Sequence, residues 1–180
     1  NLMKAESPGP SVSRLAPTVR STAKILYTIY LLMTVLEIVI LLLCGMPVFD
    51  ALTTAFGTAG TGGFGIKNDS MGGYSVTIQI IVTVFMILFG INFNVYFLLL
   101  SKKWKQALKN EEVRWYLAII LGAVLLIGWN IRGVYGSMGK AIQQAAFQVA
   151  SIITTTGFAT VDFNIWPEVS RTILVLLMFV

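Results

Sequence analysis

The sequence contains no histidine, a single cysteine and few charged residues, and each shortage excludes a class of function. Without histidine the chain lacks the commonest general base and the commonest metal ligand. Cys44 alone forms neither an internal disulfide framework nor a thiolate metal cluster, and its place at the end of an apolar run predicts a packed side chain. No activated serine and no paired carboxylates are apparent, so we expect neither an enzyme nor a bound cofactor.

Charge is scarce because long apolar runs occupy most of the chain. Charged residues make up 12% of the 180 residues, about half the share of an average soluble domain, whereas hydrophobic residues make up 56%. Apolar runs cover residues 25–45, 76–100, 115–131 and a last stretch from Pro167 to Val180. A helix of about 20 residues crosses the ~30 Å hydrocarbon core of a membrane. We therefore expect an all-α polytopic membrane protein, and we expect the fourth run to continue beyond Val180 in a longer chain.

The basic residues are distributed unevenly about these runs. Nine of the 13 lie before the first run or after the second, namely Lys4, Arg14, Arg20, Lys24, Lys102, Lys103, Lys105, Lys109 and Arg114. Cytoplasmic loops carry the excess of Lys and Arg in membrane proteins. The pattern predicts that residues 1–24, a polar lead-in at the membrane surface, and the linker 101–114 are cytoplasmic. Orientation alone explains most of the charge of the linker, and docking of a cytoplasmic subunit is the alternative.

A glycine-rich stretch, TAGTGGFG at residues 58–65, lies between the first two runs and suggests two different functions. Its part from Gly60 to Gly65 satisfies the G-x-G-x-x-G pattern of dinucleotide-binding loops. That pattern requires a preceding strand and an acidic residue about 20 positions later. Here residues 47–59 have the length of a half-helix within a membrane, and positions 80–90 carry no carboxylate. The nucleotide-binding interpretation is therefore rejected.

The stretch recurs 94 residues later, which also argues against a plain glycine-rich turn. Residues 51–65 align with 145–159, and a second half-helix is expected over 137–153. The two loops share Thr-x-Gly-Phe, whereas the other glycines of the first loop are replaced in the second. The order of span, half-helix, loop and span is repeated with the same spacing. The chain therefore divides into two helix–pore loop–helix units, residues 25–100 and 115–180.

A duplicated loop of this kind fits a potassium-selective filter. Backbone carbonyls replace the hydration shell of K⁺ in the Thr-Val-Gly-Tyr-Gly filter of potassium channels. Glycine is needed because carbonyls that point the same way force positive φ at some positions. The C-terminal ends of the half-helices point at the loops and favour a cation. The expected K⁺ ligands are Thr61, Gly62, Gly63, Phe64, Thr155, Thr156, Gly157 and Phe158. Gly72 lies outside both loops, and we expect a serine there to be nearly silent.

The chain resembles the Trk/Ktr/HKT superfamily of potassium transporters, and within it the membrane subunit of the bacterial TrkH type. Both loops carry the resemblance, together with the lead-in ESPGPSVSRLAPTVRSTAKILYTIY, the stretch GINFN and the segment AFQVASIITTTGFATVDF. It implies a pore of four units, of which this chain carries the second and third, with one critical glycine in each, here Gly63 and Gly157. It also implies K⁺ as the transported substrate, a homodimer in the cell (inner) membrane, and a cytoplasmic nucleotide-binding partner of the TrkA type.

Polar residues inside the apolar runs are further candidates. Gly90, Asn92 and Asn94 align by the 94-residue shift with the place where the resemblance implies a gate in the third unit. We regard them as gate-adjacent, with hydrogen bonding between helices as the alternative. Glu37 is a functional candidate because it is an acid within a span, and a structural carboxylate is the favoured alternative. Three acids are expected near the outer mouth, where they would concentrate cations: Asp50, Asp69 and Asp162.

Two other functions stay open at this point. The potassium-binding subunit of an ATP-driven pump of the Kdp type has similar loops, although the TrkH-like lead-in argues against it. A membrane receptor or scaffold is the alternative from a different class, and it has no need for duplicated filter loops. Nothing in the sequence points to nucleic acid as a partner. Conduction of K⁺ by a potassium-uptake subunit is the function that the sequence favours.

Overall fold

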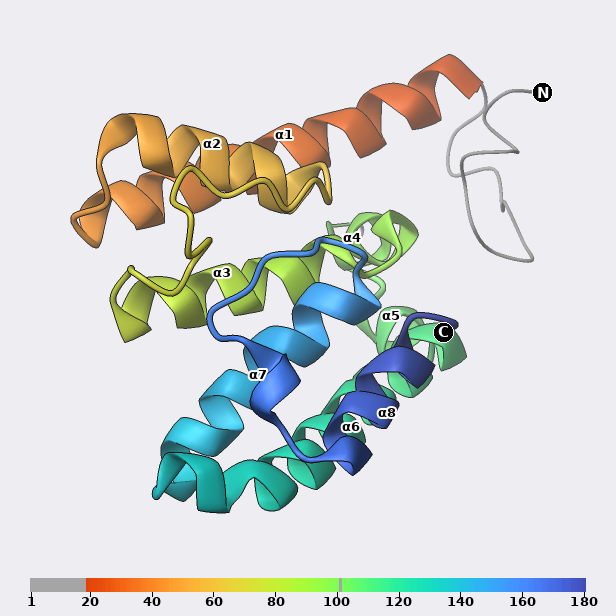
Figure 1. The fold of residues 1–180 in the computed structure, drawn as a ribbon. Helices are drawn as coiled ribbons and strands as arrows, with labels where there is room; N and C mark the ends of the chain where they lie inside the picture. The colour runs from red at the N-terminus through yellow and green to blue at the C-terminus, as the bar shows by residue number, and fades with distance from the viewer. Residues whose placement is uncertain (1–18, 101) are drawn as a thin grey trace.

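The computed structural model describes residues 19–100 and 102–180, and within them the chain is helical without strands. The helices are α1 (Val19–Leu43), α2 (Val48–Ala59), α3 (Val76–Phe89), α4 (Phe93–Leu100), α5 (Trp104–Leu108), α6 (Glu111–Tyr135), α7 (Met138–Ile153), the 3₁₀ helix η2 (Phe163–Ile165) and α8 (Glu168–Leu177). The expected all-α fold is confirmed (Figure 1). Most of the predicted lead-in, residues 1–18, lies outside the described residues.

Each unit opens with a long helix and a shorter helix that folds back beside it. α1 packs against α2 in the first unit, and α6 packs against α7 in the second. Figure 1 shows these two hairpins on opposite sides of α3, and α3 contacts both α2 and α7. The segment Ala23–Leu43 of α1 and the whole of α6 are long and apolar enough to cross a membrane. α3, a helix of the first unit, therefore packs against the half-helices of both units.

The half-helices α2 and α7 begin and end close to the predicted bounds 47–59 and 137–153. Pro47 precedes α2 with a φ of −56°, which its ring fixes and which suits the start of a helix. The 12 residues of α2 reach only about 18 Å at the helical rise, too little to cross the hydrocarbon core. Alanines of both half-helices are fully buried and allow close packing with neighbouring helices: Ala51, Ala55, Ala141 and Ala145.

The apolar run over residues 76–100 forms two helices in the structure, with the break at the predicted gate-adjacent residues Gly90 and Asn92. α3 and α4 meet at an angle of 89° around residues 90–92. Two tyrosine hydroxyls bond backbone carbonyls at the break, because that of Tyr96 donates to Leu88 (2.6 Å) and that of Tyr116 donates to Ile87 (3.2 Å). Asn92 caps the start of α4 by accepting the N–H of Asn94 at 3.0 Å. Hydropathy alone did not reveal this bend.

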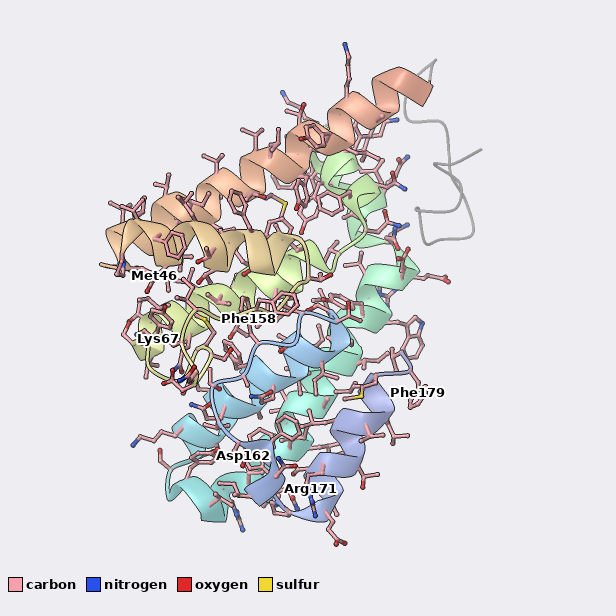
Figure 2. The ribbon with its side chains drawn as sticks, turned by 45° about the horizontal axis from the view of Figure 1, so that its top comes forward. Met46, Lys67, Phe158, Asp162, Arg171 and Phe179 are labelled. Carbon is pink, nitrogen blue, oxygen red and sulfur yellow. The ribbon has the colours of Figure 1, made fainter. Side chains whose placement is uncertain are left out.

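One buried cluster lies within the second unit, between α6, α7 and α8. Another is formed by residues of α1, α2, α3 and α7 with Phe158, and it holds the two units together. Figure 2 shows Phe158 inside the molecule, between the side of α2 and the side of α7. The prediction for Cys44 was wrong, because its side chain is exposed at the turn between α1 and α2 rather than packed.

Candidate functional site

Both glycine-containing loops leave the C-terminus of a half-helix with the same set of backbone hydrogen bonds. In the first loop, the N–H of Thr61 bonds the carbonyl of Thr58 (3.3 Å), and that of Gly62 bonds Gly57 (2.8 Å). The corresponding bonds of the second loop lie 94 residues later, from Thr155 to Ile152 (3.0 Å) and from Thr156 to Ser151 (2.9 Å). This is the Schellman arrangement, in which a residue of left-handed conformation ends a helix. The repeat found in the sequence is therefore also a repeat of backbone geometry.

The residue that ends each half-helix in left-handed conformation is a threonine. Thr61 has a φ of 50° and Thr155 a φ of 57°. Glycine is the usual residue at such a position, and a β-branched side chain there is an outlier that costs about 1–3 kcal/mol. Two residues later, Gly63 and Gly157 also have positive φ, of 64° and 87°. Both loops thus hold the same two positions in a conformation that most residues avoid.

The two loops touch at Gly63. A Cβ atom at residue 63 would lie 1.9 Å from the carbonyl oxygen of Thr156 and 2.9 Å from the carbonyl carbon of Gly157. Only glycine permits this approach, and its positive φ independently disfavours any larger residue. Gly157 has the same backbone conformation, but a Cβ at that position would meet no atom within 4 Å. The structure thus brings together Gly63, Thr156 and Gly157 from the two predicted sites.

Alternate side chains of the second loop are buried. Thr154, Thr156 and Phe158 are buried, whereas Thr155 and Gly157 are exposed. The hydroxyls of Thr154 and Thr156 lie 2.8 Å apart and share a hydrogen bond. Ser151, fully buried in α7, donates its hydroxyl to the carbonyl of Phe158 at 2.6 Å. This loop is therefore held by hydroxyl groups on its protein-facing side.

The first loop has none of these hydroxyls, because glycine stands at each corresponding position: Gly57, Gly60 and Gly62 in place of Ser151, Thr154 and Thr156. Its side chains also point outward. Phe64 is 87% exposed, whereas its counterpart Phe158 is 1% exposed. The ring of Phe158 rests on the first half-helix, where a Cβ at Gly57 would lie 2.9 Å from its Cζ atom. The second loop is thus covered by the first unit, while the first loop is open.

The segment after the first loop also holds the second one. Met71 donates its N–H to the carbonyl of Ala159 (2.8 Å), and the N–H of Ala159 donates to the hydroxyl oxygen of Ser70 (3.2 Å). Ala159 directly follows Phe158, so both of its backbone polar groups are fixed by the other unit. The candidate site is consequently built jointly by the two units rather than by each half-helix alone.

Two of the three acids expected at the outer mouth, Asp50 and Asp162, have structural partners. The Tyr74 hydroxyl donates to Asp50 at 2.7 Å, and the Lys67 ammonium lies 3.9 Å from the centre of the Tyr74 ring. Burial raises the pKa of the Tyr74 phenol, and its bond to Asp50 raises that pKa further, so the phenol stays a donor. Asp162 caps η2 by accepting the N–H of Asn164 at 2.9 Å. Within the described residues no group of three acids or cysteines could hold a metal ion.

The polar candidates within the spans lie close to the second loop or between helices. A Cβ at Gly90 would lie 2.3 Å from the Tyr116 hydroxyl and 2.9 Å from Cγ2 of Thr154, which begins the second loop. Asn92 donates to the carboxylate of Glu112 in α6 at 3.2 Å, so it also bonds between helices as the alternative predicted. Glu37 is fully buried, and neither carboxyl oxygen has a hydrogen-bond partner among the described residues.

Comparison with known families decides which proteins share this architecture. The family model of TrkH, described as a cation transport protein, matches residues 2–180. The chain belongs to the TrkH family. The resemblance noted in the sequence is therefore confirmed, and the matched family is a transporter family rather than an enzyme family.

Relatives of this TrkH-family chain are longer proteins. The Trk system potassium uptake protein TrkH of Salmonella typhimurium is 37% identical over 172 residues, which are 92% of this chain and 35% of that protein. The potassium uptake protein TrkG of Escherichia coli is 32% identical over 183 residues, covering 98% of this chain and 37% of that protein. The crystal structure of the potassium transporter TrkH from Vibrio parahaemolyticus superposes with a TM-score of 0.86 at 32% identity, covering 98% of this chain and 39% of that one. This chain therefore spans between a third and two fifths of the length of these relatives.

Several residues that shape the site of this TrkH-family chain escaped the sequence analysis. Ser151 had a detectable signal, because it is a polar residue inside an apolar half-helix. Ser70 gave a weaker signal, since nothing in the sequence shows which distant residue it will contact. The sequence also gave no sign of the role of Gly57, because its contact with the ring of Phe158 is visible only in the structure.

Proposed function

We propose that this chain supplies two of the loops that form the potassium-selective filter of a potassium-uptake transporter in the cell membrane. The observation that carries the proposal is the shared backbone conformation of the loops, with positive φ at Thr61 and Gly63 and again at Thr155 and Gly157. Residues held in rarely populated conformations cluster where function requires them. The matched relatives, which are named as potassium uptake proteins, indicate the ion.

The chemistry of such a filter needs backbone rather than side chains. Carbonyl oxygens replace the water molecules around K⁺, so the ion sheds its hydration shell without a large cost. Left-handed residues alternating with ordinary ones let successive carbonyls face one side of the loop. The half-helices α2 and α7 end directly at the loops, and their C-terminal dipoles stabilise a cation there. Thr61, Gly62, Gly63 and Phe64 are the proposed ligands in the first loop, and Thr155, Thr156, Gly157 and Phe158 in the second.

Two loops form half of a filter with four walls, and the open sides of these loops support that count. Phe158 packs on the half-helix of the preceding unit, whereas the equivalent Phe64 is exposed. Gly63 abuts the following loop, whereas the equivalent Gly157 faces open space. In the complete protein a preceding unit covers Phe64 and a following unit meets Gly157. We accordingly place residues 25–100 and 115–180 as the second and third of four units.

The assembly and orientation follow from the basic residues and the family. We propose that the linker over residues 101–114 and the N-terminal end of this segment lie in the cytoplasm, where the basic residues are expected. A homodimer and a nucleotide-binding partner of the TrkA type are the corresponding proposals for the complete transporter. Membership of the TrkH family favours this assembly over a Kdp-type pump.

Replacement of the two filter glycines tests the proposal. Gly63→Ser and Gly157→Ser are introduced separately into the complete transporter, and the uptake of K⁺ and Na⁺ is measured in cells that lack other potassium-uptake systems. A side chain at positive φ costs about 1–2 kcal/mol, and about 1.4 kcal/mol of differential binding is tenfold in selectivity. We expect both variants to lose preference for K⁺ while still inserting into the membrane. Gly63→Ser is the more severe, because its Cβ also collides with the carbonyl of Thr156.

The matched control is Gly133→Ser in α6, where the added Cβ meets no atom within 4 Å and φ is not positive. This variant keeps the wild-type ratio of K⁺ to Na⁺ uptake. If Gly63→Ser and Gly157→Ser insert normally and also keep that ratio, the loops are turns and not a filter.

A further inference from the structure

A chain of side-chain amides runs from α3 of the first unit to the end of the second loop. Gln79 lies in α3, Gln143 and Gln144 lie in α7, and Thr160 follows the second loop. The hydroxyl of Thr160 bonds Oε1 of Gln144 (2.5 Å). Nε2 of Gln144 bonds Oε1 of Gln143 (3.1 Å), and Nε2 of Gln143 bonds Oε1 of Gln79 (2.6 Å).

The chain ends on backbone carbonyls of the outer segment that follows the first loop. Nε2 of Gln79 lies within hydrogen-bond distance of the carbonyls of Met71 (3.0 Å), Tyr74 (3.2 Å) and Gly72 (3.4 Å). Gln79 is 5% exposed and Thr160 is 8% exposed, so the two ends of the chain are shielded from solvent. A buried amide group without a hydrogen-bond partner is costly. The side-chain amides of Gln79, Gln143 and Gln144 each have such a partner.

The backbone carbonyls bonded by Gln79 determine the donor and the acceptor of every hydrogen bond between these side chains. Carbonyl oxygens only accept, so Gln79 turns its NH₂ group towards them and its oxygen towards Gln143. Gln143 must then donate to Gln79 and accept from Gln144, which in turn accepts the hydroxyl proton of Thr160. Each middle position needs a group that donates on one side and accepts on the other. A carboxylate of the same size only accepts, so Glu cannot replace Gln here.

Backbone bonds close this chain into a ring. Met71, which accepts from Gln79, also donates to the carbonyl of Ala159 at 2.8 Å, and Ala159 is the neighbour of Thr160. A Cβ at Gly72 would lie 2.9 Å from the carbonyl oxygen of Thr160, so the two segments also touch there. The outer end of the second loop is therefore held in two ways, by the ring at Ala159 and Thr160 and by Ser151 at the carbonyl of Phe158.

The first loop has a different hydrogen-bond arrangement at the equivalent positions. The 94-residue shift pairs Gln144 with Asp50, Gln143 with Phe49 and Thr160 with Ile66. Asp50 accepts the hydroxyl of Tyr74, as Gln144 accepts that of Thr160, but no amide chain continues from Asp50 among the described residues. The ring is thus found only at the second loop among the described residues. Gln79, which links its two sides, comes from the first unit.

We propose that Gln79 is a positioning residue that sets the ion preference of the second loop by holding its outer end through this ring. The inference rests on the proposed function, since it assigns the loop at Thr155–Phe158 to the filter. Gln79 touches no predicted ion ligand, and it acts through Gln143, Gln144 and Thr160 on one side and through Met71 on the other. Loss of the ring releases Thr160 and removes the support that Gln79 gives to Met71, which holds Ala159, so the backbone next to Phe158 can shift.

The test compares Gln79→Leu, Gln79→Glu and Gln143→Leu in the complete transporter, with K⁺ and Na⁺ uptake measured in potassium-uptake-deficient cells. The amount of transporter in the membrane is measured alongside. We expect each variant to lower the ratio of K⁺ to Na⁺ uptake, by about tenfold for Gln79→Leu. Gln79→Glu keeps the size of the side chain, but its carboxylate has no donors and carries a negative charge, so this variant breaks the hydrogen bonds without opening a cavity. The matched control is Thr83→Val, one turn further along α3, where the hydroxyl donates to the backbone carbonyl of Gln79 at 2.8 Å.

If the effects of two substitutions on the ratio of K⁺ to Na⁺ uptake do not add, the two residues act through the same ring. The double variant Gln79→Leu with Gln143→Leu lowers the ratio no more than Gln79→Leu alone, because the first change already opens the ring. A purely structural role lowers the amount of protein and leaves the ratio unchanged, and that result would overturn the proposal. If Gln79→Leu fails to insert, Gln143→Leu, at a half-buried position, decides in the same way.

The two proposals fail separately. If Gly63→Ser and Gly157→Ser change the ratio while the Gln79 and Gln143 variants do not, the filter stands and the positioning role of Gln79 is wrong. If all of these variants insert and keep the wild-type ratio, the filter assignment itself is wrong.

Discussion

Gly57 of the first half-helix and Phe158 of the second loop are in direct contact, at a point where one added carbon would lie 2.9 Å from the Cζ atom of the ring. The two residues belong to different units and are 101 positions apart in the sequence. Phe158 is fully buried, so its ring has little room to withdraw. The absence of a side chain at residue 57 is therefore a packing requirement of the second loop.

Gly57→Ala is expected to destabilise the purified transporter by about 1–3 kcal/mol, because overpacking in a filled core forces neighbouring groups to move. Phe158→Leu removes the ring atom that the new methyl group meets, so Gly57→Ala costs less in that background. Thermal unfolding of the four proteins in detergent measures the coupling. Gly122→Ala in α6, where nothing lies within 4 Å, is the control and leaves the midpoint unchanged or slightly higher. Equal costs of Gly57→Ala in both backgrounds would contradict the contact.

Ser151→Ala is expected to leave the buried carbonyl of Phe158 without its hydroxyl donor. A buried acceptor without a partner costs about 1–3 kcal/mol, so the thermal midpoint falls. The ratio of K⁺ to Na⁺ uptake falls as well, because this carbonyl belongs to a proposed ion ligand. Ser137→Ala provides a control at the start of the same helix, since the Ser137 side chain makes no capping bond to α7. A Ser151→Ala transporter with wild-type midpoint and selectivity would show that the bond is dispensable.

Gly90→Ala is expected to slow K⁺ uptake without changing the ratio of K⁺ to Na⁺. The new methyl group displaces the Tyr116 hydroxyl, which lies 2.3 Å from the Cβ position and caps the broken helix at Ile87. Tyr116→Phe removes that hydroxyl, and Gly90→Ala then adds less than it does alone. Initial uptake rates of the single and double variants test this. A changed ion ratio with an unchanged rate would assign the break to selectivity and not to gating.

Labelling of single cysteines is expected to place positions 66–73 outside and 102–110 inside the cell. The background carries Cys44→Ser, because the exposed Cys44 would itself react. Membrane-impermeant reagents label the first set in intact cells and the second only after the membrane is opened. Labelling of both segments from the same side would exclude the proposed path of the chain, in which α2 and the first loop re-enter the membrane.

The parts of the fold that depend on local sequence could be predicted. The half-helices were placed within about one residue of α2 and α7, because Pro47, Ser137 and the loop threonines mark their ends. The repeat could be found because one loop is a variant of the other. The first prediction needed only neighbouring residues, and the second needed only the comparison of two short segments of the same chain.

The parts that depend on distant partners could not be predicted. The break in the 76–100 span is completed by Tyr116, 29 residues beyond the carbonyl that it caps. Gly72 looked replaceable because it lies outside the motif, yet a Cβ there would lie 2.9 Å from Thr160, so a serine is no longer expected to be silent. Gln79 and Gln143 are 64 positions apart, and their bond depends on how α3 and α7 pack. A single sequence holds no record of such pairs.

Covalent linkage of the two units has a consequence for how such a protein can change over evolutionary time. In an assembly of identical subunits, one altered codon changes every wall of a pore together. In the proposed filter, glycines occupy the positions of the first unit where the second has Ser151, Thr154 and Thr156, so the two walls differ in sequence. A substitution can therefore alter one wall of the proposed filter and leave its neighbour unchanged.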